Sequence, residues 1–312
     1  MLSVDWPHGD RLRAYAKINL SLAVLARRAD GFHEIRTVFQ TISLADTLLV
    51  SFEPSRRTRI DVTSSVSIPG ENICARAADR VLAAAGQNGH VRIHIQKRIP
   101  MGGGLGGGSA DGAAVLRWLA LRLGRQLDLA ALAADLGSDV PFFLEGGCAV
   151  GAGRGEELYP LPHPGAVEGI LLTPPVQVST AAAYGGLGRP GLVDVPDARH
   201  WPAAERVRAL AWALDRRAPL PDWAGACVND FEASVFSRYP QLARLRENLV
   251  AAGALVARMT GSGAALFGLY RNREAANRAA EGLRAVLREG GVRRFRFLSR
   301  AAYQRSWRRS VL

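Results

Sequence analysis

The spacing of apolar and polar positions along the chain changes repeatedly between strand-like and helix-like periods. Alternating or continuous apolar runs predict strands at residues 17–25, 47–52, 59–62, 91–95, 168–172, 254–259, 264–269 and 294–298. Apolar residues at helical spacing predict helices at 72–85, 109–123, 128–136, 203–214, 240–252 and 273–287. Gly86 and Gly124 are placed to end the first two helices, and Asp128 is placed to cap the third. Strands and helices mixed in both halves indicate an α+β protein.

Length and composition bound the organisation of the chain. Its 312 residues are 48% hydrophobic and 22% charged, so we expect a folded protein with room for two domains. A proline-rich stretch at residues 160–166 separates two segments of mixed strands and helices. We therefore predict one domain at residues 1–160 and a second at 161–312.

Simple absences disfavour several classes of protein. No apolar run reaches the roughly 18 residues of a membrane-spanning helix, so no contact with a membrane is expected. The first ten residues lack the basic and apolar regions of a secretory signal. Cys74, Cys148 and Cys227 are odd in number and far apart, which argues against a disulfide framework and favours a reducing cytoplasm. The histidines have no metal-ligand spacing, so a structural zinc site is not expected.

Positive charge is concentrated near the end of the chain. The formal net charge is +12, and the residues from Gly290 onward contain seven arginines and no Asp or Glu. With Phe295, Phe297, Tyr303 and Trp307 interleaved, this region could contact nucleic acid. The plainer interpretation is an edge strand at residues 294–297 followed by a solvated tail, and the alternation of arginine with phenylalanine favours it.

The strongest local signal is the glycine-rich run PMGGGLGGGS at residues 100–109. It follows a predicted strand and opens a predicted helix, and six of its seven central positions are glycine. Glycines let the backbone approach a ligand and turn its N–H groups inward, and a helix N-terminus adds partial positive charge. The run therefore predicts a phosphate-binding loop. A flexible linker is the alternative, but a linker does not usually join a strand directly to an apolar helix.

Two familiar phosphate loops do not fit this run. A Walker A loop ends in Gly-Lys-Ser/Thr, and no lysine follows these glycines. Gly102, Gly104 and Gly107 match a dinucleotide-binding fingerprint, which would need a second strand ending in an acid near residue 127. Asp128 is the acid in that region, but it begins a predicted helix, so the dinucleotide interpretation fails on context.

Residues 100–114, PMGGGLGGGSADGAA, resemble the central ATP-binding motif of the GHMP kinases, a family that includes galactokinase, homoserine kinase and mevalonate kinase. Three further segments strengthen the resemblance: AYAKINLSL at 14–22, RADGFHEIRTVFQ at 28–40 and LGSDVPFF at 136–143. The later segments NDFE at 229–232 and MTGSGA at 259–264 agree with it. Together they are most similar to the members that act on a cytidine diphosphate-linked methylerythritol.

The resemblance implies a two-domain fold and a reaction. The N-terminal domain would bind the nucleotide and contain a left-handed βαβ unit, and the C-terminal domain would be ferredoxin-like, with the active site between them. The γ-phosphoryl group of ATP, with Mg²⁺, would move to the 2-hydroxyl of the substrate. Another small-molecule kinase of the family, of the homoserine or mevalonate type, remains the alternative.

The resemblance also implies the catalytic residues. Asp139 would be the general base, because phosphoryl transfer needs a carboxylate that orients the attacking hydroxyl and accepts its proton. From its own segment, Asp139 could equally be a helix cap. Lys17 would lie beside Asp139 and meet the developing phosphate charge, although a lysine in a strand is more often on a solvated face.

Only two of the forty basic residues are lysines, and both fall in segments that the resemblance places near phosphate. Lys97 precedes the glycine run by three residues and would lie near ATP, Asn72 would contact adenine, and Ser109 would reach Mg²⁺ or a phosphate oxygen. The ATP-binding set is Asn72, Lys97, Pro100, Met101, Gly102, Gly103, Gly104, Leu105, Gly106, Gly107, Gly108, Ser109 and Ala110. Gly261 and Gly263 would bring a second tight loop near the phosphates.

Substrate contacts follow from the same resemblance. Asn19 and His33 match substrate-binding positions, with His33 able to hydrogen-bond the edge of the cytosine and Phe32 able to stack on its face. Tyr184 would close the other face. Phe32 could instead be an ordinary core residue, but Asp30 and Gly31 beside it indicate an exposed turn. The oligomeric state stays open, with a homodimer among the options.

Overall fold

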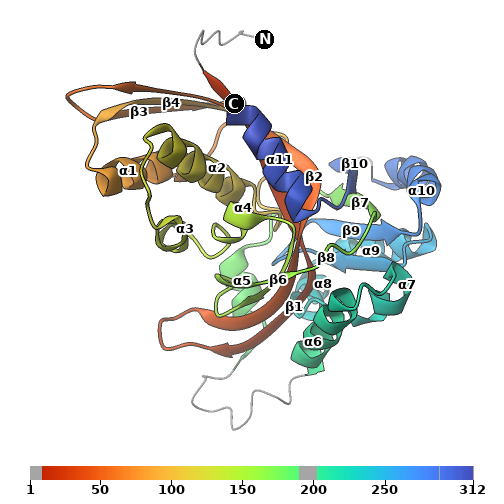
Figure 1. The fold of residues 1–312 in the computed structure, drawn as a ribbon. Helices are drawn as coiled ribbons and strands as arrows, with labels where there is room; N and C mark the ends of the chain where they lie inside the picture. Colours follow the sequence, from red (N-terminus) through yellow and green to blue (C-terminus); the bar gives the residue numbers. More distant parts are fainter. Residues whose placement is uncertain (1–8, 190–201, 288, 312) are drawn as a thin grey trace.

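The computed structural model describes residues 9–189, 202–287 and 289–311, and most of the N-terminal stretch discussed above lies outside this range. The described part of the chain is built on two β-sheets (Figure 1). The larger sheet has the order β3-β4-β2-β5-β6, with β1 paired to β2, and the smaller has the order β10-β7-β9-β8. Within the described ranges, no helix has the length and apolar character needed to cross a membrane.

The larger sheet is built around one long hairpin. The strands β1 (Asp10–Arg27) and β2 (His33–Pro54) pair antiparallel, and they extend well beyond the predicted strands at 17–25 and 47–52. Nearly every residue of β1 after its first four positions is buried, so its apolar run is covered on both faces of the sheet. The remaining strands are β3 (Arg59–Ser64), β4 (Gly89–Gln96), β5 (Cys148–Ala152) and β6 (Glu157–Leu161).

Helices pack on this sheet to form the first core. They are α1 (Ile73–Ala85), α2 (Gly107–Arg122), α3 (Leu129–Leu136) and the short α4 (Phe142–Glu145). The parallel pair β3 and β4 is joined through α1, which makes the expected βαβ unit. The predicted caps are present: Gly86 is left-handed after α1, and Asp128 accepts the backbone N–H of Ala131 in α3.

The smaller sheet has the topology of a ferredoxin-like domain. Its strands are β7 (Glu168–Thr173), β8 (Val256–Met259), β9 (Leu266–Tyr270) and β10 (Gly291–Arg296), and all neighbours are antiparallel. α9 (Pro240–Ala251) precedes β8, and α10 (Arg273–Val286) connects β9 to β10, as in a β-α-β-β-α-β unit. The order β10-β7-β9-β8 brings the first and third strands to the centre. This confirms the α+β, two-part fold.

The long connection after β7 supplies further helices. These are α5 (Thr180–Gly185), α6 (Pro202–Asp215), α7 (Leu220–Trp223), the 3₁₀ helix η3 (Ala224–Ala226) and α8 (Phe231–Arg238). One core lies between the two halves, where Ile18 and Leu20 of β1 pack in a cluster with Leu171 and Phe267 of the smaller sheet. The hairpin thereby joins both halves, and its middle section lies close to the second sheet.

The end of the chain corrects one prediction. β10 is an edge strand with Phe295 buried and its neighbouring arginines exposed, as predicted. The solvated tail after it is wrong, because residues 300–311 form α11 (Arg300–Val311) and bury both Tyr303 and Trp307. Figure 1 shows α11 lying against the first half of the molecule, close to α4 and the hairpin. Two aromatic residues four positions apart on one helix face explain why the helix packs there.

Candidate active site

A cavity of about 940 Å³ lies beside the glycine run and is lined from both halves of the chain. Its walls come from the hairpin, the glycine run, the turn before α4, α5 and the turn after β8. The sequence-predicted residues that line it are Lys17, Asn19, Phe32, His33, Gly104, Gly106, Ser109, Asp139, Tyr184 and Gly261. Segments that are more than 200 residues apart in the sequence therefore meet at one cavity.

Lys17 and Asp139 form an ion pair in this cavity. The Nζ of Lys17 lies 3.3 Å from Oδ2 of Asp139, and the carboxylate is about one-third exposed while the lysine is buried. The backbone N–H of Lys17 donates to the carbonyl of Leu105 at 3.0 Å, so the strand is fastened directly to the glycine run. Lys17 therefore does not lie on a solvated face. α4 has no side-chain capping bond, so the cap interpretation of Asp139 is also wrong.

A buried polar network holds Lys17 in place. Its Nζ donates to Oδ1 of Asn19 at 2.8 Å, and Nδ2 of Asn19 donates to the hydroxyl of Thr37 at 2.8 Å. The backbone N–H of Asn19 donates to the Thr260 hydroxyl at 3.0 Å, which links β1 to the turn after β8. That hydroxyl lies 3.3 Å from both Oδ1 of Asn19 and the carbonyl of Gly104. Asn19 therefore orients the lysine, and its buried position leaves it little surface for direct substrate contact.

The glycine run takes backbone conformations that only glycine adopts easily. Gly102, Gly104 and Gly106 all have positive φ angles, of 71°, 73° and 68°. A side chain at Gly104 would overlap the carbonyl oxygen of Thr260, because the turn after β8 packs against the run. The predicted second glycine loop therefore contacts the first one directly. α2 begins at Gly107, so the free N–H groups of its first turn lie at the same place.

A second cavity of about 340 Å³ adjoins the first along the glycine run. It is lined by the predicted nucleotide residues Asn72, Lys97, Pro100, Met101, Gly102, Gly103, Gly104, Leu105, Gly106, Gly107, Gly108 and Ser109, together with Ile68, Glu71, Ile73, Ile95 and Asp111. Gly104, Gly106 and Ser109 line both cavities, so a ligand in one can reach the other. The side-chain oxygen of Asn72 caps α1 by accepting the N–H of Cys74, which leaves its amide group for a ligand. Ala110 is buried behind the run and lines neither cavity.

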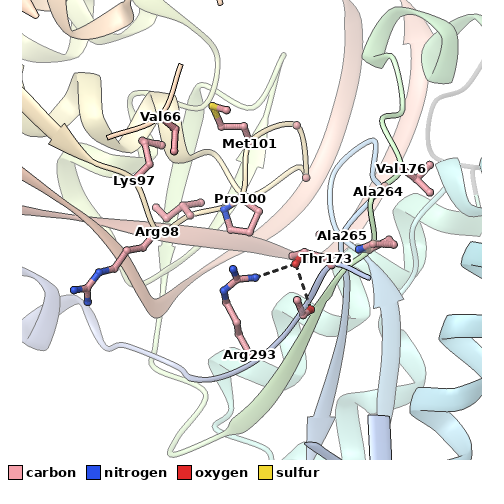
Figure 2. A pocket seen from close by; sticks show the side chains of 16 residues that line it. Val66, Lys97, Arg98, Pro100, Met101, Thr173, Val176, Ala264, Ala265 and Arg293 are labelled. Carbon is pink, nitrogen blue, oxygen red and sulfur yellow. Dashed lines mark hydrogen bonds between the residues drawn. The ribbon is translucent and has the colours of Figure 1, made fainter. Parts of the chain in front are cut away.

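A third cavity of about 430 Å³ extends from the start of the glycine run toward the smaller sheet. Figure 2 shows Pro100 and Met101 on one side of it and Thr173 on the other. Arg293 of β10 donates to the hydroxyl of Thr173 at the end of the neighbouring strand β7, at 3.0 Å. The smaller sheet therefore forms part of the wall next to the nucleotide cavity.

Lys97 lies beneath the glycine run and is held by two carboxylates. Its Nζ pairs with Asp46 and lies 2.9 Å from Oδ2 of Asp111, and all three side chains are buried. Asp46 also accepts the backbone N–H of Ile99 at 2.8 Å, so it fixes the segment that leads into the run. Burial lowers the pKa of Lys97, but the two carboxylates outweigh it and hold this pKa above its usual value. Burial raises the pKa of Asp111 to about 8, although Lys97 opposes the rise.

Aromatic residues occupy the other end of the large cavity. The imidazole of His33 stacks on the ring of Tyr184 with centroids 4.6 Å apart, and Tyr184 meets Phe231 edge-on at 4.8 Å. Phe32 is half exposed, which agrees with the predicted turn, and the guanidinium of Arg154 lies 4.8 Å from its ring centroid. Since His33 already covers one face of Tyr184, a base stacked on Tyr184 would have to use the opposite face.

Charge at this end comes from residues that the sequence interpretation missed. Arg27, Arg154 and Arg189 line the cavity. Burial lowers the pKa of His33, and the positive charges of Arg27 and Arg189 lower it further, so the imidazole stays neutral at pH 7. Arg154 sits in a tight turn between two glycines of positive φ, and that glycine–arginine–glycine pattern was the available signal.

The oxygen donors near the glycine run suit a metal that is held chiefly by phosphate. No group of three or more His, Cys, Asp or Glu able to hold a metal occurs among the residues that the structure describes. Ser109 lines both cavities, and Asp139 lines the larger one. Mg²⁺ commonly keeps several waters and binds through few protein oxygens plus substrate phosphates, so this sparse donor set fits it.

Comparisons with known proteins agree with this geometry. The family model "GHMP kinases N terminal domain" matches residues 72–147, and "GHMP kinases C terminal" matches residues 210–289. The 4-diphosphocytidyl-2-C-methyl-D-erythritol kinase of Solibacter usitatus is 46% identical, over 96% of this chain and 92% of its own length. A crystal structure of 4-(cytidine 5'-diphospho)-2C-methyl-D-erythritol kinase superposes with a TM-score of 0.74 at 39% identity, covering 92% of this chain and 98% of that one.

A homoserine kinase from Cytophaga hutchinsonii shares the fold, with a TM-score of 0.71 and coverage of 96% of both chains, but its identity is only 19%. The chain therefore shares high sequence identity over nearly its whole length with the cytidylyl-substrate kinases, while it shares only the fold with the homoserine kinase. The chain belongs to the GHMP kinase family, among its 4-diphosphocytidyl-2-C-methyl-D-erythritol kinases.

Proposed function

We propose that the protein transfers the γ-phosphoryl group of ATP to the 2-hydroxyl of 4-diphosphocytidyl-2-C-methyl-D-erythritol, a step of non-mevalonate isoprenoid precursor biosynthesis. One observation carries the proposal: the Lys17–Asp139 ion pair faces the glycine run in a cavity whose other end holds His33 and Tyr184. A phosphate-binding loop, a carboxylate–lysine pair and an aromatic end suit ATP, an attacking hydroxyl and a nucleobase in turn.

Asp139 orients the attacking hydroxyl and accepts its proton as the hydroxyl oxygen bonds to the γ-phosphorus and the bond from that phosphorus to the bridging oxygen of ADP breaks. Its carboxylate is partly exposed to the cavity, so a substrate hydroxyl can reach it. Lys17 pairs with that carboxylate and adds positive charge where negative charge grows on the transferred group. Because the backbone N–H of Lys17 bonds to Leu105, the pair is held at a fixed place relative to the glycine run.

The glycine run and the start of α2 bind the phosphates of ATP through backbone N–H groups, and Asn72 contacts the adenine with its free amide. Lys97 acts on this site through its contacts with Asp46 and Asp111. Ser109 would hold Mg²⁺ together with phosphate oxygens, and the metal would supply positive charge to the phosphates. The free, buried cysteines are consistent with work in the reducing cytoplasm.

At the aromatic end of the large cavity, neutral His33 can both donate and accept hydrogen bonds at the edge of a cytosine. Phe32 and Tyr184 offer aromatic faces, and Arg154 adds positive charge beside Phe32 for the diphosphate. Substrates of the homoserine or mevalonate type carry no base, so this aromatic end favours the cytidylyl substrate over theirs.

A substrate panel tests the proposal. The purified protein is incubated with Mg-ATP and, separately, the cytidylyl substrate, homoserine and mevalonate, and phosphorylated product is measured by phosphorus NMR. We expect turnover of the cytidylyl substrate alone. Turnover of homoserine or mevalonate at a comparable kcat/KM would contradict the proposed substrate, and absence of any turnover would contradict the proposed reaction.

A further inference from the structure

The C-terminal helix α11 packs against the segment that carries Asp139. It contacts both β1 and α4 in the first half of the molecule (Figure 1). Tyr303 is buried, and its hydroxyl donates to the carbonyl of Phe143 in α4. Burial raises the pKa of Tyr303 to about 12, so the hydroxyl keeps its proton to donate at any working pH.

The contact between α11 and α4 is close on both sides of that hydrogen bond. Gly146 and Gly147, which follow α4, have φ angles of 65° and 83°. A side chain at Gly146 would start 2.5 Å from the ring of Tyr303, and one at Gly147 would start 2.8 Å from Cβ of Arg300. Gln304 also donates to Glu145 at 3.3 Å. The two segments therefore fit each other closely, and α4 cannot shift without moving α11.

α4 in turn contacts the catalytic parts of the cavity. The ring of Phe143 packs so closely on the glycine run that a side chain at Gly106 would start 2.7 Å from it and 3.3 Å from Cε of Lys17. The backbone N–H of Phe143 donates to the carbonyl of Val140 at 3.1 Å, and the N–H of Val140 donates to Gly137 at 3.0 Å. The Val140–Gly137 bond closes the turn that contains Asp139, and the Phe143–Val140 bond joins that turn to α4. One short segment thus joins the α11 contact, the glycine run and the carboxylate.

We propose that α11 positions the active site, with the Tyr303 hydroxyl seating α4 so that Asp139 meets Lys17 and Phe143 braces Gly106. The inference rests on the proposed function for its kinetic readout, but the geometry itself concerns only this chain. Tyr303 lines neither the large cavity nor the nucleotide cavity and acts through the Phe143 carbonyl, so it is a positioning residue. A helix that merely added stability would affect unfolding and leave the rate of phosphoryl transfer unchanged.

Trp307 provides a matched control on the same helix. It is buried like Tyr303, and the guanidinium of Arg117 in α2 lies over both rings, 4.1 Å from the Trp307 centroid and 6.0 Å from that of Tyr303, but Trp307 belongs to the core of the first half. Both Tyr303→Phe and Trp307→Phe keep an aromatic ring and remove one buried polar group. Only Tyr303→Phe removes a contact with α4.

The test compares both variants with the wild type at a temperature where thermal unfolding shows all three folded. We expect Tyr303→Phe to lower kcat about tenfold with little change in KM, because the loss of one buried hydrogen bond corresponds to about a tenfold effect. Trp307→Phe should keep kcat within about twofold of the wild type. Wild-type kcat in Tyr303→Phe would overturn the inference.

A second measurement works without substrate and so separates this inference from the proposed function. Amide hydrogen exchange, followed by mass spectrometry, reports local opening of residues 137–147. We expect faster exchange there in Tyr303→Phe than in the wild type or in Trp307→Phe. Equal exchange in all three proteins would overturn the positioning role, even if the wild type turned over none of the tested substrates.

Discussion

The two lysines of this chain have opposite surroundings although both lie beside the glycine run. Lys17 meets one carboxylate, Asp139, which is partly open to the large cavity. Lys97 lies between Asp46 and Asp111, both of them buried. From this difference we expect Lys17, more than Lys97, to present its charge to a substrate, because the number and burial of a lysine's acidic partners decide how available its charge is.

The largest expected effect on stability comes from Lys97→Met. It would leave the buried carboxylate of Asp46 without a cation, and removing one partner of a buried ion pair costs about 3–5 kcal/mol. We expect a lower free energy of unfolding by about that amount in urea titrations, with kcat nearly unchanged in the folded fraction. A stable variant that had lost ATP binding would instead make Lys97 a direct phosphate ligand.

The same substitution at Lys17 should lower activity strongly and stability only slightly, which is the reverse of what we expect at Lys97. Lys17→Met removes positive charge at the reacting group, so we expect kcat to fall about 10²–10³-fold. Its carboxylate partner is partly solvated, so the free energy of unfolding should change by only about 1 kcal/mol. An equal decrease in the free energy of unfolding in the Lys17 and Lys97 variants would contradict the proposed difference between the two lysines.

A smaller effect is expected in the pH dependence of stability. The pKa of Asp111 is about 8 in the folded protein and about 3.9 in an unfolded chain. Between these values the folded state binds more protons, so the contribution of Asp111 to the free energy of unfolding falls as pH rises. Asp111→Asn should flatten the decline between pH 6 and pH 8 in urea titrations.

Asp135 supplies the control for that measurement, since it lies on the exposed side of α3 and pairs with Arg80. Asp135→Asn should retain the wild-type slope. A slope in Asp111→Asn as steep as in the wild type would mean that another group titrates in this range.

Much of the fold and the centre of the site could be predicted from the sequence, for identifiable reasons. Lys17, Asp139 and the glycine run lie in short motifs whose chemistry is local, and the structure brings all three to one cavity. The partners of Lys97 could not be found this way, because Asp46 is 51 positions away and the contact depends on how β2 and β4 pair. Sequence spacing alone does not encode such a contact.

The C-terminal helix was missed for a different reason. Its arginines dominated the composition and suggested a solvated tail, whereas Tyr303 and Trp307, at helical spacing, bury one face. The strands β5 and β6 were missed because glycine and proline interrupt them, and Pro160 is tolerated since β6 is an edge strand. Arg154 lies in the turn between these two strands, so it was missed together with them.

The central claim is that the Lys17–Asp139 pair carries out phosphoryl transfer on a nucleotide held by the glycine run. The most direct measurement is kcat for the cytidylyl substrate in Asp139→Asn, beside the affinity of the same variant for a non-hydrolysable ATP analogue and with Asp135→Asn as control. The account predicts a kcat about 10²–10⁴-fold below the wild type in Asp139→Asn, unchanged nucleotide affinity, and wild-type behaviour in the control. A kcat close to the wild type in Asp139→Asn would contradict it.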